Sequence, residues 1–156
     1  MLEIVNHTKQ AINKNKFNTV VELFLRAYKK PDYLVTLVLT GDAKMKTFNS
    51  RYRGLDRTTD ILSFRHEEYM GNILGEIIIN LKEAGRIVKY QELLAELKLE
   101  TLANKKQLVY IFYFLLVHGL LHLVGYNDDS EAERRVMIIL GKKFMKKIID
   151  YGIIKM

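Results

Sequence analysis

The sequence has no cysteine and only one proline among its 156 residues. Without cysteine the chain can form neither a disulfide nor a thiolate metal site, so any metal ion must be bound by nitrogen and oxygen ligands. No Pro/Gly-rich linker or internal repeat divides the chain. Together with 49% hydrophobic and 28% charged residues, this length predicts a single globular domain over residues 1–156.

The chain also lacks a recognisable targeting or membrane-spanning segment. Residues 1–4 have neither the basic nor the apolar region of a secretory signal peptide. The longest apolar run, residues 108–124, falls short of the ~20 residues that a membrane span requires, and it contains two histidines. We therefore expect a buried central helix, no membrane partner and a cytoplasmic location.

The charge of the chain is strongly basic, with a formal net value of +7 at pH 7. Lysine and arginine gain affinity for polyanions by displacing counterions from phosphates, although many basic proteins bind no nucleic acid. Residues 141–156 hold five lysines against one acidic residue, Asp150. This basic end is either a solvated face or a contact with RNA or the ribosome.

Hydrophobic periodicity predicts the order strand, helix, strand, helix, two strands and then helices. Strands are expected at residues 2–6, 33–39, 59–64 and 75–80, with a loop around 67–71. Helices are expected at residues 10–28, 43–52 and 105–124, and a last helix from a capping box at Ser130 to about residue 150. Residues 81–101 should be mostly helical and hold no site residue. The last helix should pack through Val136, Ile139, Leu140, Phe144 and Ile148. This order indicates an α+β fold, a sheet of about four strands packed against helices around a buried central helix.

A possible metal site lies at the end of that central helix. His118 and His122 are four residues apart and so project from one face of a helix. Gly125 can adopt the left-handed conformation that ends a helix, and the chain then turns back toward Asp128. Two imidazoles and one carboxylate are a ligand set of catalytic zinc, and they also suit other divalent metals.

Several alternatives remain for these residues. The two histidines could be satisfied core residues, and Asp128 could stabilise the following helix N-terminus without any metal. Asp129 competes with Asp128 as the third ligand, although it lies closer to the capping box. Gly119 replaces the glutamate of a related zinc-protease pattern, so we do not expect peptide hydrolysis by that mechanism. The glycine would instead make room for a substrate or a neighbouring backbone.

A second group of candidate residues surrounds a glycine-containing turn. Its arginines are Arg51, Arg53, Arg57 and Arg65. A guanidinium group can bind a phosphate through two parallel hydrogen bonds. The cluster is therefore either a phosphate-binding site or a solvated basic loop. We assign no role to the two remaining histidines, His7 and His66.

Both motifs resemble those of one family. Residues 118–128, His-Gly-Leu-Leu-His-Leu-Val-Gly-Tyr-Asn-Asp, resemble the H-G-x-L-H-L-x-G-Y-D-H motif of the YbeY family. Residues 52–64 resemble that family's Y-R-G-K-D-K-P-T-D-V-L-S-F stretch, and the strand at residues 75–80 resembles its L-G-D-I-x-I strand. The chain departs from these patterns at Leu55 in place of lysine, at Thr58 in place of proline, and at Asn127 and Asp128 in place of Asp-His.

The resemblance implies the YbeY fold and a metal-dependent endoribonuclease that cleaves single-stranded RNA during ribosomal RNA maturation. It implies a zinc ion, or another divalent metal, on His118, His122 and Asp128, with Asp128 at the place of the family's third histidine. Arg53, His118 and His122 would be catalytic. The implied partners are ribosomal RNA, the small ribosomal subunit and its assembly proteins, with no DNA. The alternatives are a non-catalytic ribosome-biogenesis factor with a structural or lost metal, and a metal-dependent hydrolase of another substrate.

Overall fold

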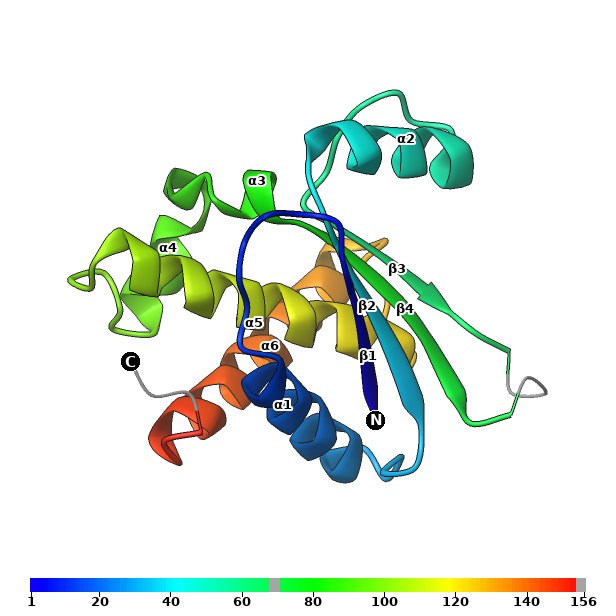
Figure 1. Ribbon diagram of the computed structural model, residues 1–156. Coiled ribbons are helices and arrows are strands. Elements are labelled where there is room, and N and C mark those ends of the chain that lie inside the picture. The colour runs from blue at the N-terminus through cyan, green and yellow to red at the C-terminus, as the bar shows by residue number, and fades with distance from the viewer. Residues whose placement is uncertain (68–70, 154–156) are drawn as a thin grey trace.

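The computed structural model describes residues 1–67 and 71–153. Its strands β1 (Leu2–Asn6), β2 (Leu34–Thr40), β3 (Ile61–Arg65) and β4 (Ile73–Asn80) form one sheet in the order β1-β2-β4-β3 (Figure 1). β2 pairs in parallel with both β1 and β4, whereas β3 pairs antiparallel to β4 at the edge. Positions 68–70 of the loop expected between β3 and β4 lie outside the described residues. The predicted α+β fold is confirmed.

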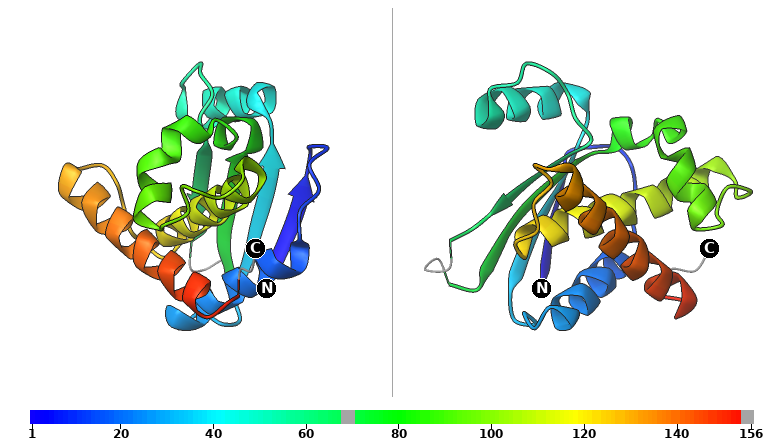
Figure 2. Two further views of the ribbon diagram at one scale, coloured as in Figure 1. Left: turned by 90° about the vertical axis from the view of Figure 1, so that its left-hand side faces the viewer. Right: turned by 180° about the vertical axis from the view of Figure 1, so that it is seen from behind.

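The helices are distributed unequally about this sheet. They are α1 (Lys14–Ala27), α2 (Asp42–Arg53), α3 (Leu81–Ala84), the 3-10 helix η2 (Ile87–Tyr90), α4 (Gln91–Glu96), α5 (Asn104–Leu123) and α6 (Glu131–Asp150). α1, α5 and α6 pack on one face, and α2 lies apart from them beyond one end of the sheet (Figures 1 and 2). Met45 of α2 forms a small separate core with Leu62 and Ile78. The expected helical stretch at residues 81–101 thus consists of three short helices.

The start of α1 differs from the prediction. The hydrophobic pattern placed it near residue 10, but the helix begins at Lys14. The side chain of Asn13 accepts a hydrogen bond from the backbone N–H of Lys16 (3.1 Å) and so caps the first turn. An N-cap of this type ends the preceding extended chain, because its own backbone is not helical.

α5 is the central helix of the fold. By length and composition alone it could cross a membrane, but 67% of its most apolar stretch is buried inside the protein, as in the core helix of a soluble protein. Its buried residues include Tyr113, Leu116 and Leu120, which belong to the main hydrophobic core. The predicted buried central helix is therefore present.

Gly119 lies on the face of α5 that packs against β4. A Cβ at this position would lie 2.9 Å from Cγ2 of Ile77, which is fully buried. The glycine makes room for this side chain of the sheet. Our expectation that it leaves space for a substrate or a neighbouring backbone is therefore corrected, because a side chain fills this space.

α6 begins with the predicted capping box of Ser130 and Glu133. The prediction of its packing face is partly wrong, because Val136 and Ile139 are 47% and 59% exposed. The buried residues are Met137, Gly141, Phe144, Met145 and Ile148. A Cβ at Gly141 would lie 3.2 Å from Cε2 of Phe114 on α5, so the helix turns its glycine toward α5.

The contact between Gly119 and Ile77 leads to a prediction about stability. Gly119→Ala should gain about 1 kcal/mol of helix propensity, but the methyl group should overpack Ile77 at a cost of about 1–3 kcal/mol. We expect the free energy of unfolding in urea to fall by up to about 2 kcal/mol. In an Ile77→Ala background the same change should stabilise the protein instead. An equal effect in both backgrounds would contradict this close contact.

Candidate metal centre

After the last turn of α5 the chain reverses its direction. The backbone N–H of Gly125 donates to the carbonyl of His122 (3.0 Å), and that of Tyr126 donates to the carbonyl of Leu121 (3.0 Å). Gly125 has a φ of +111°. These two hydrogen bonds define a Schellman motif, which satisfies carbonyl groups at a helix end and favours glycine at this position. The reversal brings Asp128 back toward the two histidines.

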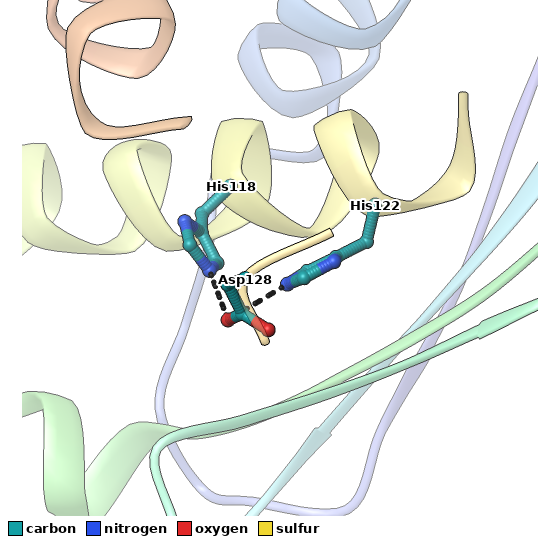
Figure 3. A group of neighbouring side chains, drawn as sticks. All are labelled: His118, His122 and Asp128. Carbon is teal, nitrogen blue, oxygen red and sulfur yellow. Dashed lines mark ion pairs between the residues drawn. The ribbon is translucent and has the colours of Figure 1, made fainter. Parts of the chain in front are cut away.

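His118, His122 and Asp128 lie together at this helix end (Figure 3). Oδ2 of Asp128 is 3.3 Å from Nε2 of His122 and 3.8 Å from Nε2 of His118. The three ligand atoms lie within 4.8 Å of one another. Ligands around a tetrahedral zinc ion are separated by roughly 3.3 Å, given metal–ligand bonds of about 2.0–2.1 Å. This group could therefore hold a metal ion after a small contraction.

The hydrogen bond of His122 determines which of its two ring nitrogens is available to a metal ion. Nδ1 of His122 lies 3.0 Å from the carbonyl oxygen of Tyr126. A carbonyl oxygen only accepts hydrogen bonds, so Nδ1 is the donor in this contact. Nε2 lies on the other side of the ring and faces the Asp128 carboxylate, so a metal ion between these two groups could be bound by both. Metal-bound histidines usually have such a partner on the other ring nitrogen.

His118 has the protonation state that a metal ligand needs. Burial lowers the pKa of His118, and the neighbouring His122 lowers it further, whereas Asp128 and Asp60 act in the opposite direction. A pKa below the ordinary value of 6.5 keeps the imidazole neutral at pH 7. The neutral imidazole is the form that binds metal ions.

The loop that carries Asp128 is attached to α6 as well as to α5. Nη1 of Arg134, in the first turn of α6, donates to the backbone carbonyl of Asp128 (3.1 Å). Two residues later, Ser130 begins α6 through its capping box. The backbone of Asp128 is therefore held from both helices. The rival candidate Asp129 lines the same cleft but is not part of the three-residue group among the described residues.

The three residues open into a cleft of about 530 Å³ between α5 and β3. Its wall also contains Arg53, at the end of α2, and Arg65, at the end of β3. The structure thus brings the predicted catalytic arginine into the same cleft as the predicted metal ligands. Of the four arginines singled out in the sequence, these two line the cleft, so the cluster is only in part a solvated loop.

Asn80, at the end of β4, helps to position the segments on either side of Arg53. It is fully buried. Its side-chain amide donates to Oδ1 of Asp42 (2.8 Å), at the start of α2, and to Oγ1 of Thr58 (2.9 Å). Its side-chain oxygen accepts from the first backbone N–H groups of α3. One buried amide therefore links three segments that meet beside the cleft.

Two cleft residues were not identified from the sequence. Tyr90, on η2, is 8% exposed, and its hydroxyl donates to Oδ2 of Asp60 (3.0 Å). Both side chains line the cleft. Asp60 lies within the motif at residues 52–64, but Tyr90 comes from the stretch at 81–101, where we expected no site residue. No pattern along the chain links residues 30 positions apart.

The charges that line the cleft do not favour a polyanion by themselves. The two arginines, Arg53 and Arg65, face three carboxylates, those of Asp60, Asp128 and Asp129. With neutral histidines the cleft has an excess of one negative charge. A phosphate group would therefore enter this cleft readily only with a bound cation, which reverses the sign of the local charge.

Comparisons with known proteins agree on one family. The family model described as "Endoribonuclease YbeY" matches residues 3–149. A relative named Endoribonuclease YbeY from Heliobacterium modesticaldum is 35% identical over 132 residues, which cover 76% of this chain and 72% of the relative. Another, from Persephonella marina, is 31% identical over 147 residues, covering 91% and 88%. The solution structure of a Thermotoga maritima protein matches with a TM-score of 0.54 and 25% identity, over 97% of this chain and 91% of that chain.

The hydrogen bond between Tyr90 and Asp60 leads to a prediction about pH. Burial raises the pKa of Tyr90 above 10, and the Asp60 carboxylate raises it further. The contribution to stability is therefore complete below pH 10 and is lost as the pH rises above it, where an unfolded tyrosine ionises. Between pH 9 and pH 11 the parent should lose about 1.4 kcal/mol more unfolding free energy than Tyr90→Phe.

At pH 8, where no tyrosine ionises, Tyr90→Phe should be less stable than the parent by about 1–2 kcal/mol, because it removes a hydrogen bond to a carboxylate. Tyr151→Phe makes the same change at a side chain that is 70% exposed, and it serves as the matched control in urea unfolding. Parallel pH profiles for the parent and Tyr90→Phe would contradict the prediction.

Proposed function

The chain belongs to the YbeY endoribonuclease family, and from this premise we propose that it is a metal-dependent endoribonuclease that cleaves single-stranded RNA. The observation that carries the proposal is the convergence of His118, His122 and Asp128 in a cleft that also contains Arg53. A ligand group and a phosphate-binding side chain in one cleft are what phosphodiester hydrolysis requires.

The donor set of the site fits zinc best. Two imidazole nitrogens and one carboxylate oxygen leave a fourth position open, whereas magnesium prefers oxygen ligands alone. A divalent ion bound there would supply Lewis-acid chemistry, activating water and polarising a phosphoryl oxygen. The chain contributes the orientation of the ligands: the Tyr126 carbonyl fixes the tautomer of His122, and Arg134 holds the backbone of Asp128.

Arg53 acts on the substrate. Its guanidinium group can donate two parallel hydrogen bonds to the scissile phosphate and stabilise the negative charge that develops there. None of the ion pairs among the described residues includes Arg53. The side chain therefore needs to break no salt bridge before it binds a phosphate.

In the cell, the proposed role is ribosomal RNA maturation in the cytoplasm, with ribosomal RNA, the small ribosomal subunit and its assembly proteins as partners. The net charge of +7 suits a polyanionic substrate. The basic residues of α6 contribute to this charge, although Lys142 pairs with Glu96 and Lys155 lies outside the described residues. The proposed unit of activity is the whole chain, residues 1–156.

The first prediction of this proposal concerns the third ligand. Protein purified without a histidine tag should contain about one zinc ion, measured by elemental analysis. His122→Ala and Asp128→Asn should lose the metal while remaining folded, because these side chains lie at a helix end and in a loop rather than in the core. Asp129→Asn is the matched control and should retain the metal. Undiminished zinc in Asp128→Asn would exclude this carboxylate as a ligand.

The second prediction concerns Arg53. Arg53→Ala should lower kcat/KM for single-stranded RNA by about 10²-fold without changing the metal content, since it removes one donor to the transition state. Arg53→Lys should restore only part of the activity, because lysine lacks the two-pronged donor geometry. Arg51→Ala, on the same helix but outside the lining of the cleft, is the control.

A chelator decides between the proposal and its alternatives. Cleavage of RNA by the parent protein that stops on chelation and returns with zinc supports the enzyme. RNA binding with neither metal nor cleavage would instead identify a ribosome-biogenesis binding factor. A zinc-loaded protein that leaves RNA intact would be a binding factor with a structural metal if it binds RNA, and a hydrolase of another substrate if it does not.

A further inference from the structure

A second cleft, of about 760 Å³, adjoins the first along β3. We propose that this second cleft binds the same RNA strand beyond the scissile phosphate, with a backbone phosphate held by Lys30 and Arg65. This inference rests on the proposed function, because it extends the substrate of the metal-bearing cleft. The residues involved come from the loop after α1 and from the end of β3.

The two clefts share one side chain and one strand. Arg65 lines both of them. β3 residues 61–65 line the first cleft, and the chain from Arg65 to Glu67 lines the second. At about 3.3 Å per residue, this extended segment is roughly 20 Å long. A single strand of RNA lying along it would pass from one cleft to the other over Arg65.

The position of Arg65 depends on Gly125. A Cβ at Gly125 would lie 3.1 Å from Nη1 of Arg65. The guanidinium group therefore lies against the backbone that ends α5, next to the loop that carries Asp128. Gly125 thus ends the helix and also leaves room for a cation where the two clefts join.

The charge of the second cleft is opposite to that of the first. Lys30 and Arg65 face one carboxylate, Glu67, whereas the first cleft has more carboxylates than arginines. Among the described residues, neither Lys30 nor Arg65 forms an ion pair. Both cations can therefore bind a phosphate without breaking a salt bridge. The second cleft supplies the attraction for RNA that the first lacks.

Tyr33 positions the lysine. The ammonium group of Lys30 lies 4.7 Å from the centroid of the Tyr33 ring. Such a cation–π contact restricts a flexible lysine while its charge remains available to an anion. The side chain is thus held at the cleft before RNA binds, which reduces the conformational entropy lost on binding.

The test measures the binding of single-stranded RNA analogues with a non-hydrolysable backbone, extended one nucleotide at a time at either end, to zinc-loaded protein, so that the first cleft holds its cation and cleavage does not interfere. In the parent, affinity should increase abruptly at one length, when the strand reaches the second cleft. Lys30→Ala should abolish this increase. It should also make the negative slope of log affinity against log salt shallower by ~0.7, the value of one phosphate contact on a single strand. Between 50 and 200 mM salt, its affinity should then fall about 2.6-fold less than that of the parent.

Two variants control this experiment. Lys106→Ala removes the same charge from an exposed position on α5 that lines neither cleft, and it should bind as the parent does. Lys30→Glu should weaken binding to long oligomers more than Lys30→Ala. With cleavable RNA, Lys30→Ala should cleave the shortest substrates at the parental rate, and kcat/KM should fall only for longer ones.

The outcomes separate this inference from the proposed function. Equal salt slopes and equal length dependence for Lys30→Ala and Lys106→Ala would overturn the second-cleft proposal, whether or not the parent cleaves RNA. Binding of an acidic peptide that depends on Lys30, with RNA binding unaffected, would also overturn it. A parent that cleaves no RNA but shows the Lys30-dependent increase with length would refute the nuclease activity and support the second cleft.

Discussion

The close contact between α5 and β4 at Gly119 determines the geometry of the whole site. α5 carries both histidines, while β4 pairs with β3, the strand that forms the opposite wall of the cleft. Because glycine lets the helix approach Ile77 directly, the distance from the histidines to the cleft wall is set inside the core. Dense interiors adjust little to changes in volume, so such a site is positioned more rigidly than one built on loops alone.

Much of this arrangement could be predicted from the sequence, for reasons that are local. The spacing of His118 and His122, the glycine three residues later and the Ser130 capping box each depend on neighbours along the chain. The contact between Tyr90 and Asp60 depends instead on how η2 folds back over β3, and no local pattern encodes it. The packing face of α6 was only partly predicted, because Gly141, which is not a hydrophobic residue, decides which side meets α5. The two clefts could not be predicted from the sequence either, because each is lined by segments that only the tertiary structure brings together.

The polar groups around the cleft divide into two kinds. Asn80, Tyr90 and Arg134 form hydrogen bonds with other parts of the chain and hold segments in place. Arg53, Arg65 and Lys30 form no ion pairs among the described residues, and their charges remain available to a ligand. Side chains that are already held in place lose less conformational entropy when a ligand binds. Cations that form no ion pair can bind the ligand without breaking a salt bridge.

β3 is one of the two edge strands of the sheet, and across residues 1–67 and 71–153 it pairs with β4 alone. An edge strand presents unpaired backbone groups that can join another chain and begin aggregation. A fifth strand added at that edge would stand against the wall of the first cleft, so the fold cannot easily protect the edge by extending the sheet. Its protection comes from a strand of only five residues that ends in the charged Arg65. An open cleft thus prevents the sheet from growing at this edge.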